Sequence, residues 1–367
     1  MWRNVIPVQS PPGEVVHITD CYSPRTGGIE TQVANLTSAQ RQAGWSVRVL
    51  TATGGEPEFG VQRITAPIPF GLPVHPRTRD RIVRILSRDR PEIVHIHLGA
   101  TSPFAWGAIR AVRELGIPTV VTVHSMWGDI SQRGYQLFAR KLTDSGVLWS
   151  AVSQEAASSV KAALGVPVSV LPNGIEVTEW QCANRPAANL RIVGVLRMAP
   201  RKRVIPWLKI VHQVQQATPS VSATLIGDGP LLAHAKKFAQ RNRIEVNFRG
   251  RLDRMGMLDV FAESDAFLQA STRESFGIAA LEARTAGLAI VARLGTGTGS
   301  FIAQGVNGYL ESSDSNIVNR LRQLSLDLDE LTRIKENNQT PPQFDWQYMV
   351  KVSGDLYNEA QRRVFDN

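Results

Sequence analysis

The chain alternates short apolar runs, rich in β-branched residues, with longer segments whose apolar positions recur at helical spacing. In the first half, the short runs occupy residues 13–19, 45–52, 91–99, 118–124, 146–153 and 167–173. Between them, segments such as Ile29–Ala43 and Ser102–Leu115 have the periodicity of amphipathic helices. Strand-length runs that alternate with helices predict a parallel sheet covered by helices on both faces.

The alternation stops once and then begins again. Residues 172–190 are rich in turn formers and have little periodicity. Further apolar runs follow at residues 190–196, 222–229, 246–250, 266–271, 288–293 and 308–312. The tail has apolar residues at helical spacing and predicts a final helix. The pattern therefore predicts two α/β domains in tandem, each of the nucleotide-binding type.

Length and composition restrict the class of protein. The 367 residues suffice for about two domains, and 43% hydrophobic with 20% charged residues is typical of a soluble globular chain. The two cysteines, Cys21 and Cys182, stand far apart outside any Cys-x-x-Cys, which argues against a disulfide framework or a structural zinc site. Because no apolar run has the length of a secretory signal or a membrane span, we expect a cytoplasmic protein, at most peripheral at the inner face of the cell membrane.

The net charge of +9 favours an anionic partner. The bases are dispersed rather than clustered with aromatic residues, so we expect no nucleic acid to bind. One segment concentrates them: Arg77–Arg90 holds six arginines and two aspartates around the apolar residues Ile82, Ile85 and Leu86. Such a segment can lie on an anionic membrane, although a surface helix of the fold is the more common interpretation.

Ligands of parallel α/β sheets bind beyond the carboxyl ends of the strands, where several motifs lie. Gly27 and Gly28 follow the first apolar run and precede a helix, so their backbone can approach a phosphate, although a plain tight turn is the alternative. Arg197 and Lys202 follow the first run of the second half and together could clamp a diphosphate. The alternative is a solvated run of charge.

The segment from Glu274 to Glu282 is the most specific motif of the chain. The two acids are eight residues apart, which on a helix starting near Ser275 puts them on roughly the same face. The N–H groups of that helix would point at an anion, with Glu274 beside the ligand and Glu282 placed to accept hydrogen bonds from neutral hydroxyls. A capping acid with an unrelated surface acid is the alternative.

Other motifs are weaker. Gly227 opens a Gly-Asp-Gly-Pro turn, and residues 295–299 read Gly-Thr-Gly-Thr-Gly. Neither completes a dinucleotide fingerprint, which argues against a hydride-transfer enzyme, but both remain candidate ligand loops. The spacing of His95, His97 and His124 is compatible with zinc, yet no acidic partner accompanies them, so we expect no metal. His124, at a strand end, better suits a ligand contact.

Taken in order, these motifs resemble those of a retaining family-4 glycosyltransferase with the GT-B architecture. The sequences TGGIE, VHSMWG, VSQEAASSV, LPNGIE, RMAPRK, GDGP, ESFGIAALEA and the closing FDW…LY follow the family's order. The resemblance implies two Rossmann-like domains whose parallel sheets face an interdomain cleft. Residues 1–182, with a helix at 346–367 crossing back, would form the acceptor-side domain, and residues 183–345 would form the nucleotide-sugar domain.

The resemblance also implies roles for single residues. Arg197 and Lys202 would neutralise the leaving diphosphate, Glu274 would contact the donor sugar, and Glu282 would hold the ribose hydroxyls. His124 would touch the sugar near the reacting carbon. Further donor contacts would come from the backbone of Gly27, Gly28, Gly227, Ser275, Phe276, Gly277 and Ile278.

The implied reaction moves a hexosyl unit from a nucleotide-diphosphate sugar to a hydroxyl of a sugar, polyol or lipid-linked acceptor, such as a cell-envelope glycan precursor. In the front-face mechanism of such enzymes the leaving phosphate oxygen takes the acceptor proton, so neither a metal nor a cofactor is expected. A sugar-nucleotide epimerase or a phosphorylase of the same architecture remains the alternative, with a nucleic-acid-binding protein as the less favoured one. The chain departs from the family at Leu196 and Arg203, where glycines are usual, and at Glu176, where aspartate is usual.

Overall fold

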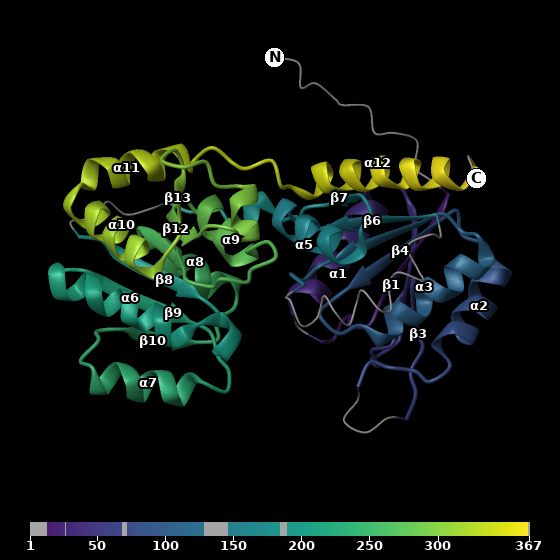
Figure 1. The fold of residues 1–367 in the computed structure, drawn as a ribbon, viewed down its shortest axis with the longest axis horizontal. Helices are drawn as coiled ribbons and strands as arrows, with labels where there is room; N and C mark the ends of the chain where they lie inside the picture. The colour runs from purple at the N-terminus through teal and green to yellow at the C-terminus, as the bar shows by residue number, and fades with distance from the viewer. Residues whose placement is uncertain (1–12, 26, 68–71, 128–145, 184–188, 366–367) are drawn as a thin grey trace, which may run out of the picture. The chain divides into compact units, whose positions relative to one another are not determined.

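The computed structural model describes residues 13–25, 27–67, 72–127, 146–183 and 189–365. The chain forms two compact α/β units (Figure 1). The first unit comprises Met1–Gly174 and Phe344–Asn367, and the second comprises Ile175–Gln343. The unit boundaries thus fall at 174/175 and 343/344, whereas the sequence analysis placed them at 182/183 and 345/346.

The first unit is built on a seven-stranded parallel sheet in the order β3-β2-β1-β4-β5-β6-β7. The strands are β1 (Glu14–Thr19), β2 (Ser46–Thr51), β3 (Val61–Arg63), β4 (Ile93–Leu98), β5 (Thr119–Val123), β6 (Val147–Ala151) and β7 (Val168–Val170). The helices are α1 (Gly28–Gln42), α2 (Thr78–Asp89), α3 (Pro103–Leu115), α5 (Gln154–Leu164) and α12 (Trp346–Phe365). The central strands β4, β5 and β6 are buried at every position, which explains why they read as continuous apolar runs rather than as alternating ones.

The last helix of the chain, α12, completes the core of the first unit (yellow in Figure 1). It packs against α1 and against strands β5 and β6. Val350, Leu356 and Tyr357 of α12 share one buried cluster with Ile93 and Val120 of the sheet. The chain therefore leaves this unit, builds the second one and returns.

The arginine-rich segment forms α2, a surface helix of the first unit. Ile82 and Leu86 are fully buried, and α2 packs against α3. The apolar stripe is therefore used by the fold itself and is not open to a membrane. The arginines of this segment are exposed.

The second unit is built on a six-stranded parallel sheet in the order β10-β9-β8-β11-β12-β13. The strands are β8 (Arg191–Val195), β9 (Ser222–Ile226), β10 (Asn247–Gly250), β11 (Ala266–Gln269), β12 (Ala289–Arg293) and β13 (Gly308–Glu311). The helices are α6 (Val204–Ala217), α7 (Leu232–Arg241), α8 (Arg254–Ala262), α9 (Ile278–Thr285), α10 (Asp314–Leu326) and α11 (Leu328–Asn337). The prediction of two parallel-sheet α/β domains is confirmed.

Two features fix the middle of the second sheet. Trp207 of α6 is fully buried, packs over Gly194 of β8 and donates its indole N–H to the carbonyl of Leu268 at 3.1 Å. Asp265, also fully buried, binds the Arg191 guanidinium at 2.7 and 3.0 Å and the Lys335 ammonium at 2.6 Å. A buried carboxylate is tolerated here because two cations neutralise it.

Among the described residues, no helix combines the length and apolar character that crossing a membrane would require.

Candidate functional site

The carboxyl edge of the second sheet brings the predicted cation and acid segments together. Strands β8 and β11 are parallel neighbours, so the loops that follow them leave the sheet on the same side. Lys202, in a short 3₁₀ turn after β8, places its ammonium nitrogen 2.6 Å from Oε2 of Glu274, in the loop after β11. Arg197, earlier in the β8–α6 loop, is exposed, and its side chain makes no hydrogen bond or ion pair with any described residue. Of the two predicted cations, Lys202 is therefore paired, and Arg197 is unpaired within the described part of the chain.

Arg203 explains how this loop keeps its shape without the glycine that is usual in the resembled family. Its backbone is left-handed, with φ of 55°, a conformation that costs a non-glycine residue about 1 kcal/mol. The Arg203 guanidinium binds the Asp314 carboxylate at 3.0 and 2.8 Å and the Ala270 carbonyl at 2.8 Å. These charge-assisted bonds offset the backbone cost and tie the β8–α6 loop to the loop after β11.

Helix α9 begins at Ile278, which corrects the expectation of a helix near Ser275. Gly277 precedes it with φ of 93°, and a Cβ on Gly277 would lie 2.7 Å from the Thr298 hydroxyl. Glu274 therefore lies in a loop rather than on the helix. The interpretation of Glu274 and Glu282 as two acids on one helical face is wrong for this reason.

The Gly-Thr-Gly-Thr-Gly segment, residues 295–299, packs against the loop that carries Glu274. The N–H of Gly297 donates to the carbonyl of Glu274 at 2.8 Å, and a Cβ on Gly297 would lie 2.0 Å from the carbonyl of Ser275. Thr298 donates its hydroxyl to the side-chain oxygen of Gln269 at 2.8 Å. These contacts give the segment a structural role that explains Gly297 without a dinucleotide.

Glu282 lies on α9 as a half-buried carboxyl group. Burial raises the pKa of the Glu282 carboxyl to about 8, since desolvation disfavours the charged form. Its side chain has no hydrogen-bond partner among the described residues, which leaves its oxygens available to a ligand. Phe276, by contrast, is buried and packs against Phe301, so only its backbone is a candidate contact.

Gly227 packs against the loop that carries Arg197. Its φ is 131°, and a Cβ there would lie 1.9 Å from the carbonyl oxygen of Leu196. The N–H of Met198 donates to the carbonyl of Asp228 at 2.8 Å, which fastens the two loops together. Gly227 thus shapes the cation loop, whatever contact it also makes with a ligand.

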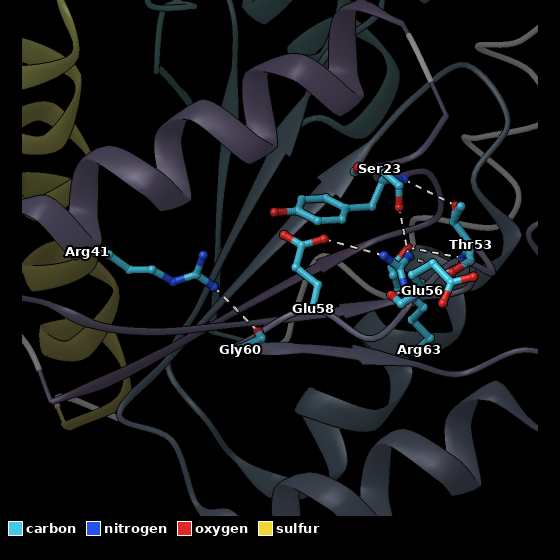
Figure 2. A network of polar contacts seen from close by, with 9 residues as sticks. Ser23, Arg41, Thr53, Glu56, Glu58, Gly60 and Arg63 are labelled. Carbon is cyan, nitrogen blue, oxygen red and sulfur yellow. Dashed lines mark hydrogen bonds and ion pairs between the residues drawn. The ribbon is translucent and has the colours of Figure 1, made fainter.

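In the first unit, Arg63 of β3 holds the loop between β1 and α1 (Figure 2). Its guanidinium donates to the carbonyls of Ser23 at 2.8 Å, Thr53 at 3.1 Å and Glu56 at 3.1 Å. The Glu58 carboxylate lies 3.4 Å away and balances the charge. The end of β1 is thereby fixed to the loop that follows β2.

The predicted glycine turn follows this loop. Gly27 is exposed and extended, with φ of −176°, and Gly28 is the first residue of α1. Neither glycine has a left-handed backbone, and a Cβ on Gly27 would collide with the Glu30 carboxylate. Close approach of a ligand to this turn stays a prediction. Thr26 lies outside the described residues.

His124 lies at the end of β5 and lines a small pocket of the first unit together with Gln32, Thr122, Asn173 and Trp346. Gln32 exchanges two hydrogen bonds with the backbone of Gly174, at 2.9 and 3.0 Å, and so holds the Pro-Asn-Gly turn at the pocket wall. Nε2 of His124 lies 3.0 Å from Nδ1 of His97. His124 is therefore part of a buried polar network as well as of the pocket.

Ring nitrogens of His17, His95 and His97 all lie within 4.8 Å of one another, a spacing compatible with a metal ion. Each of these rings already has hydrogen-bond partners: His17 binds Gln40 at 2.8 Å, and His95 binds the Tyr357 hydroxyl at 2.8 Å. The sequence analysis missed Gln40 and Tyr357, although glutamine at a buried position of an amphipathic helix is a detectable signal of a polar network.

The chain matches two sequence families. Residues 26–179 match Glycosyltransferase Family 4, and residues 183–340 match Glycosyl transferases group 1. The GPI3 subunit of the phosphatidylinositol N-acetylglucosaminyltransferase of Saccharomyces cerevisiae is 24% identical over 94% of this chain and 82% of its own length. A phosphatidyl-myo-inositol mannosyltransferase of Mycobacterium tuberculosis is 27% identical over 72% of this chain and 74% of its own length.

Solved structures share the fold. The Anabaena protein HepE, solved in complex with UDP and glucose, superposes with a TM-score of 0.74 at 18% identity, over 93% of this chain and 98% of its own. A glycosyltransferase of Rickettsia africae gives a TM-score of 0.74 at 14% identity, over 95% and 98% of the two chains.

Proposed function

Because the chain belongs to the family-4 glycosyltransferases and has the GT-B fold, we propose that it moves a hexosyl unit from a nucleotide-diphosphate sugar to an acceptor hydroxyl, with retention of configuration. The observation that carries this proposal is the contact of 2.6 Å between Lys202 and Glu274 at the carboxyl edge of the second sheet, with the unpaired Arg197 in the same loop as Lys202. Two cations and an acid there match the charges of a diphosphate and the hydroxyls of a sugar.

The charges of the site suit a departing diphosphate. Arg197 and Lys202 would neutralise it, in place of a metal ion, as the bond to the sugar breaks. The side chains of Lys202 and Glu274 are 28% and 16% exposed, so their ion pair is partly solvated and separating it costs about 1 kcal/mol. The ligand's own phosphates and hydroxyls would replace that contact.

The chemical step needs no protein base. The acceptor hydroxyl attacks the anomeric carbon on the face from which the phosphate departs, and the leaving phosphate oxygen takes the hydroxyl proton. One glycosidic bond forms as the bond to phosphate breaks, and the nucleoside diphosphate leaves. Glu274 would orient the sugar hydroxyls, and Glu282 would accept hydrogen bonds from the ribose. The roles toward the donor predicted for His124, Gly27 and Gly28 remain predictions.

For the acceptor we propose a lipid-linked polyol. The names of the two relatives support it, since both are named for transfer to phosphatidylinositol lipids. The exposed arginines of residues 77–90 would favour a peripheral contact with anionic headgroups at the inner face of the membrane.

The test begins with a thermal-shift screen of UDP-glucose, UDP-N-acetylglucosamine and GDP-mannose, followed by calorimetry with the best binder. Arg197→Ala with Lys202→Ala is expected to weaken binding at least tenfold, and Glu274→Gln is expected to abolish transfer while the protein stays folded. Arg201→Ala is the matched control, because Arg201 is exposed in the same 3₁₀ turn and its side chain makes no hydrogen bond or ion pair with the described residues. Unchanged affinity of the double variant, or normal turnover by Glu274→Gln, would refute the proposal.

A further inference from the structure

A chain of hydrogen bonds runs beneath the first-unit pocket, from its wall to the last helix. Nε2 of His124 contacts Nδ1 of His97 at 3.0 Å, and Nε2 of His97 contacts Nδ1 of His17 at 2.9 Å. Nε2 of His17 contacts Oε1 of Gln40 at 2.8 Å. The side chain of Gln40 in turn contacts Ser353 and Tyr357 of α12. His17, His97 and Gln40 are buried, so water does not compete for these bonds.

The direction of this chain is fixed at the Ser353 end. The Ser353 hydroxyl donates its one hydrogen to the backbone carbonyl of Val350 at 2.8 Å, so toward Gln40 it can only accept. The group of Gln40 that faces Ser353 at 3.1 Å must therefore be the NH₂, which also donates to the Tyr357 hydroxyl at 3.0 Å. This leaves Oε1 of Gln40 facing His17 as an acceptor.

Each ring then has one allowed proton position. His17 must carry its proton on Nε2 to donate to Gln40, so its Nδ1 accepts from Nε2–H of His97. Nδ1 of His97 then accepts from Nε2–H of His124. The rings are neutral at pH 7, because burial lowers the pKa values of His17 and His124 to about 4 and that of His97 well below 6.5.

A second branch agrees with the first. The Ser150 hydroxyl donates to the carbonyl of Val121, so it accepts from Thr122 at 2.7 Å. Thr122 in turn accepts from Nε2–H of His95 at 2.7 Å, and Nδ1 of His95 accepts from the Tyr357 hydroxyl at 2.8 Å. Tyr357 can donate there because it accepts from Gln40. Two independent carbonyl ends therefore give the same orientation of Gln40.

We propose that Gln40, acting through His17 and His97, fixes His124 in the Nε2–H tautomer, so that its bare Nδ1 serves the pocket as a hydrogen-bond acceptor for a substrate hydroxyl. Among the described residues nothing donates to this Nδ1, and His124 is half-buried at the pocket wall. Gln40 and His17 are positioning residues in this scheme. The tautomer follows from the hydrogen-bond network alone. That the hydroxyl belongs to a sugar or polyol substrate rests on the proposed function.

The unliganded protein tests the tautomer directly. In protein labelled with ¹⁵N at histidine, long-range ¹H–¹⁵N correlation spectra report which ring nitrogen carries the proton, and His124→Asn assigns the His124 signals. We expect a neutral His124 with its proton on Nε2. A proton on Nδ1, or an imidazolium at pH 7, would overturn the proposal. No substrate is needed, so this outcome is independent of whether the proposed reaction occurs.

Two variants test whether Gln40 sets the direction of the hydrogen bonds and thereby the tautomer of His124. Gln40→Met leaves Nε2–H of His17 without an acceptor, and reversing the chain relieves that orphan donor by moving the His124 proton to Nδ1. The matched control is Tyr357→Phe, which removes the His95 branch and one acceptor of the Gln40 NH₂. Because Ser353 still accepts from that NH₂, the orientation of Gln40 is kept and His124 should stay unchanged. With a working donor, Gln40→Met should also lower kcat/KM about tenfold, or roughly 1.4 kcal/mol, since the hydroxyl then meets an N–H. An unchanged His124 tautomer in folded Gln40→Met would overturn the assignment.

Discussion

Binding of the nucleotide-sugar donor is expected to release a proton from Glu282. In the free protein, burial raises the pKa of the Glu282 carboxyl from its ordinary 4.5 to about 8, and the side chain has no partner among the described residues. At pH 7 about nine in ten molecules therefore hold Glu282 protonated. If the carboxyl accepts hydrogen bonds from two ribose hydroxyls, its charged form gains stability and its pKa falls.

The size and sign of the effect follow from that difference. A fall of the pKa from about 8 back to the ordinary 4.5 would release about 0.9 proton at pH 7. Because the ligand selects the deprotonated form, affinity should rise about tenfold per pH unit between about pH 4.5 and 8 and become constant above that range. The stability of the unliganded protein should change in the opposite direction. Because the pKa of Glu282 is raised in the folded state, the free energy of unfolding should fall as pH rises from 4.5 through about 8.

Calorimetry at pH 7 in buffers of different ionisation enthalpy measures the released proton. The probe is the sugar nucleotide that binds best in the thermal-shift screen, whose two phosphates are both esterified and do not titrate between pH 6 and 8. Glu282→Gln is the matched variant, and it should show neither proton release nor a pH-dependent affinity. A binding enthalpy of the unmodified protein that does not change with buffer, or equal release by Glu282→Gln, would refute the assignment of Glu282 to the ribose.

Three further substitutions probe the second unit. Asp265→Ala should lower the free energy of unfolding in urea by about 3 kcal/mol, because the partly buried cations of Arg191 and Lys335 lose the carboxylate that binds both, and a loss below 1 kcal/mol would contradict that account. Gly194→Ala places a Cβ 2.6 Å from the Trp207 indole, so we expect a cost of about 1–3 kcal/mol with a changed near-UV circular dichroism spectrum. An unaltered spectrum would show that the indole does not pack there. Gly227→Ala should weaken donor binding measured by calorimetry, because its Cβ would lie 1.9 Å from the carbonyl oxygen of Leu196 and would displace the loop that carries Arg197. Normal affinity of this variant would show that Gly227 does not shape that loop.

The sequence predicts those parts of the structure that depend on local periodicity. The apolar run at 13–19 became β1 (Glu14–Thr19), and the periodic segment Ser102–Leu115 became α3 (Pro103–Leu115). The order of chain segments also suffices to bring Lys202 near Glu274, because both follow strands of one parallel sheet. These inferences need only the periodicity of apolar residues and the rule that the carboxyl ends of parallel strands lie at the same edge of the sheet.

Other features depend on contacts between distant segments, which local pattern does not encode. Helix α9 starts at Ile278, after the left-handed Gly277, where a Cβ would collide with the Thr298 hydroxyl. The histidine network requires β1, β4 and β5 to lie side by side, with His17 paired to His95 across the ladder. From the motifs alone, His95 and His97 could be considered only as zinc ligands. Nothing in the local pattern indicates that they share a hydrogen-bond network with Gln40.

The return of the chain to the first unit has a consequence for how the protein is made. Val350, Leu356, Tyr357 and Ala360 of α12 belong to a buried cluster whose other buried members lie before residue 175. During synthesis the second unit is complete before α12 leaves the ribosome, while the earlier half still exposes the apolar surface that α12 will cover. The nascent first unit therefore stays incomplete until the twenty residues of α12 pack onto it.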